Sequence, residues 1–274
     1  MDRLRYYQKT ITPTTTAGQH VRNLRRQAGL SQLDLALMAG VSQRHLSCVE
    51  TGRARASPGT LHALLSALGA SLEYCNEVFL AAGYAPRYAA TPLESPALDV
   101  VHAAIEQILQ ANNPVPAIVL DNNWNITAAN VSTGLLLAMA GIPQDSAAGL
   151  NLLETLLSPG GLGDRLANAQ EVRAAAWHRA ARESACNPAL AKRLSSLPPP
   201  GNAMQATVTS PMLLTRVCTA NGELSFVSTF TTFGMPLDIT VESLRIEHLI
   251  PADLSTRQRM AQAFEQWNLA HGYR

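Results

Sequence analysis

The sequence lacks any long apolar segment. Its longest apolar runs, such as residues 134–141, fall far short of the roughly 18 residues that a membrane-crossing helix needs. The first sixteen residues contain no apolar core like that of a secretory signal. With 47% hydrophobic residues in a chain of 274, the protein can still bury a large core, and two domains are the natural expectation. We therefore expect a cytoplasmic protein that does not contact a membrane.

Patterns that mark metal sites and catalysis are also missing. The four cysteines, Cys48, Cys75, Cys186 and Cys218, are widely separated and form no CxxC pair, which fits a reduced compartment better than a disulfide framework or a zinc site. The glycine-rich residues 158–164 lack the GxSxG spacing of a nucleophile elbow, and the sequence contains no HExxH motif. We expect a protein that is not an enzyme and that holds no metal or cofactor.

Charge is scarce, at 15% of residues, and it is unevenly distributed. Residues 1–90 contain ten Lys and Arg against five Asp and Glu, a net charge of +5. The remainder contains eleven against fifteen, a net charge of −4. A basic first third joined to a mildly acidic remainder predicts that only the first part meets a polyanion.

Short amphipathic helices separated by glycines are predicted along residues 17–82. Ser31 and Asp34 form the S-x-x-D pattern of a capping box at the start of one helix. Only Val41 and the glycine before it separate that helix from another, which Ser42 caps. Two short helices joined by so tight a turn predict a helix-turn-helix.

The helix from Ser42 to Thr51 has the two faces that a DNA-recognition helix requires. Helical spacing places Leu46 and Val49 on one face and the polar residues on the other or in the first turn. Arg can bind guanine, and Gln adenine, through two hydrogen bonds. The residues predicted to face the bases are Ser42, Gln43, Arg44, Ser47, Cys48 and Thr51, and those predicted to contact phosphates are Gln32, Arg53 and Arg55.

Residues 30–69 resemble the Cro/phage-repressor-type helix-turn-helix of the XRE family. The resemblance implies double-stranded DNA as a partner, a homodimer that reads paired half-sites, and a structural role for Glu50. Periodicity alone would equally fit an ordinary helical bundle, and at Cys48 a redox switch competes with a plain contact to a thymine methyl group. The matching residues are Leu30-Ser31-Gln32, Ala39-Gly40-Val41-Ser42, Leu46-Ser47, Glu50-x-Gly52-Arg53, Pro58 and Leu61.

Three prolines between residues 86 and 96 mark a join in the chain. We predict a helix-turn-helix domain at residues 1–90, a linker at 91–97 and a second domain at 98–274. Helices, a strand pair and an antiparallel hairpin in the second domain define an α+β fold after the all-α first domain. The expected elements are a helix over 97–113, strands over 116–121 and 124–130, a helix after Asn130, a long helical stretch over 163–185, a hairpin turning at Asn221-Gly222, a strand within 241–253 and a closing helix over 254–267.

This order of elements resembles a PAS-like sensor domain. More specifically, residues 95–274 resemble the MmyB-like ligand-binding domain attached to XRE-type regulators, through residues 116–130, 151–168 and 229–253. The resemblance implies a ligand-responsive transcription regulator with a closed apolar pocket, and a fatty-acyl or similar apolar molecule as its occupant.

A fatty-acid carboxylate would need a cation or a hydrogen-bond donor at the mouth of such a pocket. The residues predicted to contact the ligand are Trp124, Trp177, Arg216, Arg245 and His248. The tryptophans would serve equally as core residues, and the three basic side chains as solvated ones. Haem and flavin lack support, because His178 is the only histidine in the long helical stretch and no Asn-Cys-Arg motif occurs. The alternative function is an XRE-type protein whose second domain serves only dimerisation or protein binding.

Overall fold

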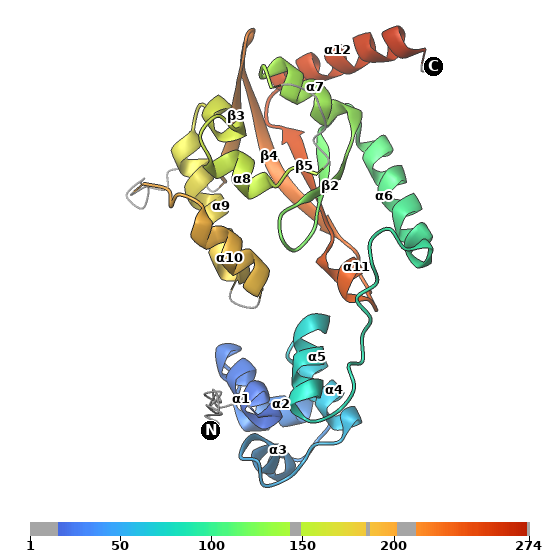
Figure 1. Ribbon diagram of the computed structural model, residues 1–274, viewed down its shortest axis with the longest axis vertical. Coiled ribbons are helices and arrows are strands. Elements are labelled where there is room, and N and C mark those ends of the chain that lie inside the picture. The colour runs from blue at the N-terminus through green and yellow to red at the C-terminus, as the bar shows by residue number, and fades with distance from the viewer. Residues whose placement is uncertain (1–15, 143–148, 185–186, 202–211, 273–274) are drawn as a thin grey trace, which may run out of the picture. The chain divides into compact units, whose positions relative to one another are not determined.

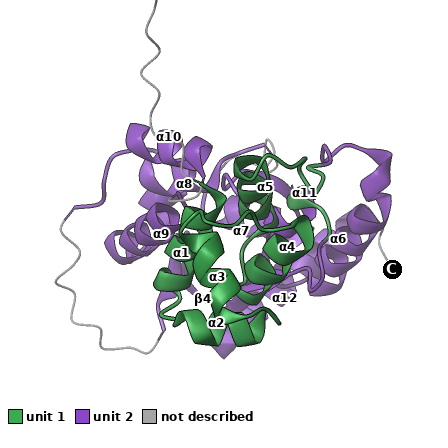
Figure 2. Ribbon diagram, turned by 90° about the horizontal axis from the view of Figure 1, so that it is seen from below, with its two compact units in different colours: residues 1–90, 237–239 green, residues 91–236, 240–274 purple. Residues whose placement is uncertain are grey.

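The computed structural model describes residues 16–142, 149–184, 187–201 and 212–272, so Cys186 lies outside the described residues. Contacts divide the chain into two compact units (Figure 2). Unit 1 comprises residues 1–90 with 237–239, and unit 2 comprises residues 91–236 with 240–274. The helices of residues 16–90 are followed by helices and a five-stranded antiparallel sheet, which confirms the predicted fold class.

Unit 1 is a helical bundle in which sequence signals set both ends of each helix (Figure 1). Its helices are α1 (Ala17–Gln27), α2 (Gln32–Met38), α3 (Gln43–Glu50), α4 (Pro58–Ala67) and α5 (Leu72–Ala81). Each begins after a residue whose hydroxyl accepts a backbone N–H bond, namely Thr16, Ser31, Ser42, Ser57 and Ser71. Glycines with φ of 63–74° end them, as predicted at Gly29, Gly40 and Gly52.

Unit 2 contains one antiparallel sheet with the strand order β2-β1-β5-β4-β3. The strands are β1 (Ala117–Leu120), β2 (Ile126–Ala129), β3 (Leu214–Thr219), β4 (Gly222–Thr232) and β5 (Arg245–Pro251). Thr219 pairs with Gly222, whose φ is 104°, so the predicted hairpin at Asn221-Gly222 is confirmed.

Helices cover both faces of this sheet (Figure 1). Because side chains alternate along a strand, Ala117 and Val119 pack with α6, while Leu120 packs with α7 to α10 on the opposite face. The helices are α6 (Asp99–Asn112), α7 (Val131–Met139), α8 (Leu152–Leu157), α9 (Ala169–Glu183), α10 (Pro188–Ser196), α11 (Ile239–Ser243) and α12 (Leu254–His271), with short 3-10 helices η1 (Pro96–Leu98) and η2 (Leu162–Arg165).

Two predicted elements of unit 2 need correction. The long helical stretch is broken between η2 and α9, because Leu166 pairs with Val217 and the N–H of Ala167 donates to a β3 carbonyl. The second strand begins at Ile126, and Trp124 lies in the preceding turn with a φ of 66°. The carboxylate of Asp121 accepts two backbone N–H bonds and extends that turn.

Candidate functional site

The recognition helix α3 presents its polar residues as predicted. Leu46 and Val49 are buried in the core of unit 1, with 0% and 3% exposure. Gln43 and Arg44 are exposed at the start of the helix, where the Ser42 hydroxyl accepts the N–H of residue 45. Two long polar side chains can therefore project from the first turn without disturbing the core that holds the helix.

The exposure of the other outward residues of α3 and its C-terminal end is mixed. Ser47 and Cys48 are half-buried, and Thr51 is exposed. The Thr51 hydroxyl donates to the carbonyl of Ser47 at 2.7 Å, so its donor is already used within the helix. Cys48 is a free thiol.

A buried ion pair fixes α3 against α1. Arg25 donates from Nε and Nη2 to the two carboxylate oxygens of Glu50, at 2.6 and 2.9 Å. Gln32 donates to the same carboxylate at 2.8 Å. Burial raises the pKa of Glu50, but the hydrogen bonds from Arg25 and Gln32 outweigh it, and the pKa lies below its ordinary value. Glu50 therefore has a structural role, and the Gln32 amide is tied to it.

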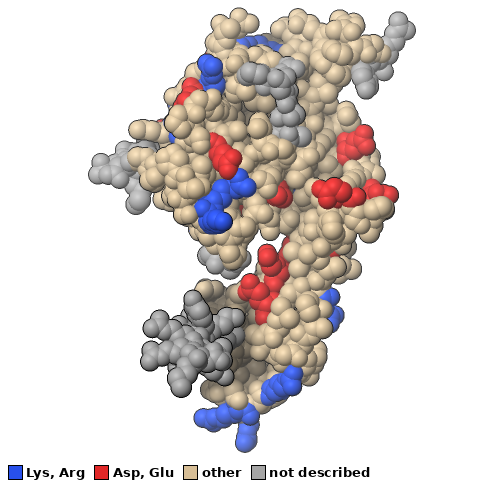
Figure 3. Space-filling model, viewed as in Figure 1, with Lys and Arg blue, Asp and Glu red and all other residues tan. Residues whose placement is uncertain are grey.

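The two arginines beyond α3 differ. Arg55 donates to the carbonyl of Ala82 at 2.8 Å and lies over the Tyr84 ring at 4.5 Å, so it joins the end of α5 to the turn after α3. Arg53 is exposed. Basic side chains are visible at the end of unit 1 that carries α3 (Figure 3). DNA contact by any of the nine predicted residues stays a prediction.

Unit 2 contains a cavity of about 320 Å³ between the sheet and α7, α8, η2 and α9. Most of its wall consists of leucine, isoleucine and valine side chains. Among the polar side chains on the wall, Thr133 and Thr155 donate to backbone carbonyls within the protein. The sheet contributes Ile118, Ile126, Thr215, Val217, Glu247 and Leu249.

Glu247 was not predicted as a site residue. The signal that could have indicated it is its position between Ile246 and His248, within a stretch predicted to form a strand. The Ser228 hydroxyl on β4 donates to one of its carboxylate oxygens. Burial raises the pKa of Glu247, against the opposing effects of that hydrogen bond and of Arg179 and Arg245.

None of the five residues predicted to contact the ligand lines this cavity. Trp124 is 4% exposed and donates from Nε1 to Glu183 at 2.7 Å, and the half-buried Trp177 packs against the same core. These two positions match the core interpretation of the tryptophans.

The three predicted basic residues are engaged elsewhere. Arg245 lies over the Trp124 ring at 4.9 Å and donates to Glu183 at 3.2 Å, whereas Arg216 lies 3.9 Å from Glu223. His248 lies within hydrogen-bond distance of Asn112 and Thr231, at 3.0 and 2.9 Å. The cavity gives no support to a cation at its wall, because none of these side chains reaches it.

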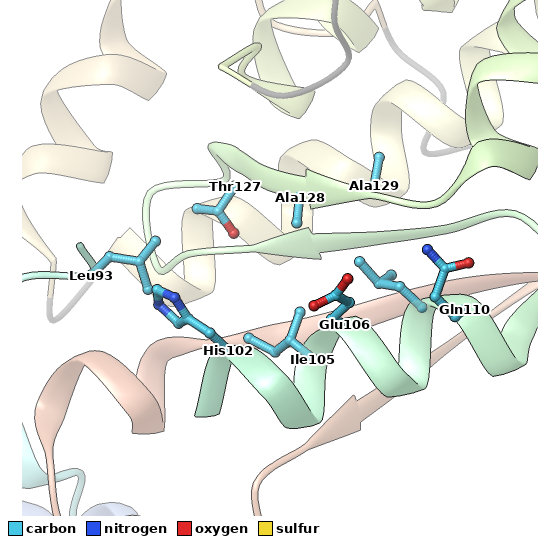
Figure 4. Close-up of a pocket in the computed structure, with 9 residues that line it drawn as sticks. Leu93, His102, Ile105, Glu106, Gln110, Thr127, Ala128 and Ala129 are labelled. Atoms are coloured by element: carbon cyan, nitrogen blue, oxygen red, sulfur yellow. The ribbon is translucent and has the colours of Figure 1, made fainter. Parts of the chain in front are cut away.

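A second hollow, of about 300 Å³, lies on the opposite face of the sheet. His102, Glu106 and Gln110 on α6 face Thr127 and its neighbours on β2 (Figure 4).

Within the described residues no group of three potential metal ligands gathers. None of the helices in that part of the chain combines the length and apolar character that crossing a bilayer requires.

A helix-turn-helix in one unit and a largely apolar cavity in the other define a DNA-binding transcription regulator with a ligand-binding domain. Residues 21–75 match the helix-turn-helix family model, and residues 101–263 match the model of the MmyB-like transcription regulator ligand binding domain. The second match spans more than half of the chain, so the chain belongs to the MmyB-like family. The XRE-type resemblance is likewise confirmed.

The solved structures with similarity to this chain include the following three. The restriction-modification controller protein C.AhdI from Aeromonas hydrophila is 32% identical over 24% of this chain and 96% of that chain, with a TM-score of 0.22. An HTH_3 family transcriptional regulator from Vibrio cholerae is 30% identical over 24% of this chain and 36% of that chain, also at 0.22. An RNA-binding Light-Oxygen-Voltage receptor is 13% identical over 97% of this chain and 69% of that chain, at 0.27. TM-scores this low support no further argument, and no curated protein matches.

Proposed function

We propose that unit 1 reads a specific DNA sequence through the first turn of α3, and that the protein does so as a homodimer in the cytoplasm. The exposed Gln43 and Arg44 beside the buried Leu46 carry this proposal. Helix-turn-helix proteins of this type read paired half-sites, and a two-fold dimer matches such symmetry.

Arg44→Ala is expected to weaken binding to the specific site by about 1–3 kcal/mol, because a bidentate contact to a base edge is lost. Binding to random DNA should change much less. Titration of both DNAs at one salt concentration measures the difference. Arg87→Ala, at an exposed position after α5, is the matched control and should leave the specificity ratio unchanged. Equal losses on specific and random DNA would reduce Arg44 to a phosphate contact.

For unit 2 we propose a PAS-like domain that binds an apolar small molecule in the cavity and alters DNA binding in response. A single antiparallel sheet with helices on both faces supports the PAS-like assignment. The observation that carries the ligand proposal is the cavity of about 320 Å³ with its largely apolar wall. An acyl or alkyl chain, the occupant that the family resemblance implied, suits such a wall. Binding regulates only if the ligand favours one protein conformation over another.

An apolar chain at about a hundred times its dissociation constant is expected to stabilise the folded protein by roughly 2.7 kcal/mol. Organic extraction of the denatured protein with mass spectrometry detects a resident ligand, and thermal unfolding with added alkyl chains measures the stabilisation. Leu137→Trp narrows the cavity and should reduce the stabilisation, whereas Leu269→Trp on the exposed face of α12 should not. If nothing is extracted and no chain stabilises the protein, the dimerisation-only alternative is favoured.

A further inference from the structure

The polar end of the ligand can be inferred from the wall of the unit 2 cavity. Within the described residues, Glu247 is the only charged side chain on that wall. It projects from β5 on the same face as Leu249, with Ile118 of the neighbouring β1 also on the wall. An apolar surface surrounds a single carboxyl group.

The hydrogen bonds of Glu247 are incomplete. Ser228 donates to Oε1, whereas Oε2 has no hydrogen-bond partner in the part of the chain that the structure describes. Thr215, on β3, lines the same cavity, and its hydroxyl likewise has no partner among the described residues. The cavity therefore offers a carboxylate oxygen and a hydroxyl to whatever it contains.

The neighbouring cations do not complete the site, because the hydrogen bonds that Arg179 and Arg245 make to a carboxylate go to Glu183 and not to Glu247. Arg179 donates to Glu183 at 2.8 Å and lies over the Phe230 ring at 3.9 Å. Arg245 donates to Glu183 at 3.2 Å, and the remaining Arg245 donors, Nε and Nη2, are buried without partners. Neither arginine lines the cavity. The competing possibility is a ligand whose anionic end binds the unpartnered donors of Arg245.

We propose that the cavity accepts an apolar molecule ending in a protonated amine, which Glu247 binds. This inference rests on the proposed ligand-sensing function of the same cavity. A charge-assisted hydrogen bond from the amine satisfies the open carboxylate oxygen, and the pairing offsets the cost of burying both charges. A fatty acid would instead place its carboxylate beside that of Glu247, and two carboxylates in a poorly solvated space repel unless one of them takes up a proton, which weakens binding.

The test compares three probes of equal chain length with the full-length protein: decylamine, decanol and decanoic acid. Calorimetric titration and thermal unfolding measure their binding. Since the chains are identical, differences in affinity report the polar end. We expect the amine to bind most tightly, the alcohol next and the acid most weakly.

Glu247→Gln preserves the shape of the side chain and the acceptor for Ser228 but removes the negative charge. It should weaken decylamine binding by about ten- to a hundredfold and leave decanol nearly unchanged. Glu106→Gln, an exposed position on the opposite face of the sheet, is the matched control and should alter neither affinity. The ranking in the unmodified protein tests the proposal even if Glu247→Gln fails to fold.

The outcomes distinguish a wrong assignment of Glu247 from a failure of the ligand-sensing function itself. If decanoic acid binds best, or if the amine preference survives in Glu247→Gln, the assignment of Glu247 is wrong while an apolar receptor remains. If decylamine binding is lost in Glu106→Gln instead, the amine occupies the second hollow and the assignment is also wrong. If none of the three probes binds, the ligand-sensing function fails, and this inference fails with it.

Discussion

Replacing Asn130 with alanine is expected to lower the free energy of unfolding of unit 2 by about 3–5 kcal/mol. Asn130 is 5% exposed, and its Oδ1 accepts the N–H groups of Ala117 and Thr133, each at 3.0 Å. Its Nδ2 donates to the carbonyls of Val115 at 2.8 Å and Leu109 at 3.3 Å. Alanine removes the side-chain bonds to α6, β1 and α7 at once, and leaves only the Asn130 carbonyl for the Thr133 N–H and the Asn112 amide for the Val115 carbonyl.

Tryptophan fluorescence reports this loss selectively, because Trp124, Trp177 and Trp267 all belong to unit 2. Denaturant unfolding followed at these residues should shift for Asn130→Ala. Gln107→Ala, an exposed amide on α6, is the control and should have little effect. Asn130→Ser retains a cap acceptor for α7 but loses both amide N–H donors. Its loss of stability should therefore lie between those of Gln107→Ala and Asn130→Ala. A loss below about 1 kcal/mol for Asn130→Ala would contradict the proposed linking role.

Arg25→Met is expected to destabilise unit 1 by about 3–5 kcal/mol, because it leaves the Glu50 carboxylate buried with only Gln32 as a side-chain partner. The Glu50 side chain is 1% exposed and that of Arg25 is 10% exposed, so water cannot replace the lost partner. The helical circular dichroism signal should begin to fall at a lower denaturant concentration than in the unmodified protein. The unfolding midpoint followed by tryptophan fluorescence should not change. Arg26→Ala, the exposed neighbour, should be nearly neutral.

Acid titration provides a second measurement of the same pair. Because the pKa of Glu50 in the folded protein is lowered from its ordinary 4.5, the pair stabilises unit 1 above that pH. The stabilisation is lost as the pH falls below 4.5 and through the lowered folded pKa. The double change Arg25→Met with Glu50→Leu should regain much of the stability and remove this acid dependence. A double variant as unstable as Arg25→Met would show that packing, and not the unpaired charge, causes the loss.

Local signals were sufficient to predict unit 1. The serine caps and the terminal glycines lie within a few residues of the helix ends that they set, so their effect needs no distant partner. The same holds for the faces of α3, since helical spacing alone separates Leu46 from Arg44. A helix was also predicted to begin after Asn130, but the bonds of Asn130 to the carbonyls of Leu109 and Val115 join segments that only folding brings together.

The sequence did not predict which hydrogen-bond partners the side chains of the helix-turn-helix have. Gln32 and Arg55 were expected to contact phosphates, and a polar residue beside a recognition helix does suggest that role. In the structure their side chains are bonded to Glu50 and to the Ala82 carbonyl, which lie 18 and 27 residues away along the chain. Long flexible side chains have many possible partners, and tertiary packing selects among them.

By itself, the sequence determined that a basic helix-turn-helix precedes an α+β domain with an apolar interior, because charge, caps and strand patterns are local properties. The tertiary structure alone decided which side chains face the cavity. Arg245 and Glu247 share one strand face, yet Arg245 packs on Trp124 while Glu247 lines the wall. That difference depends on the helices packed over each position, which strand alternation does not specify.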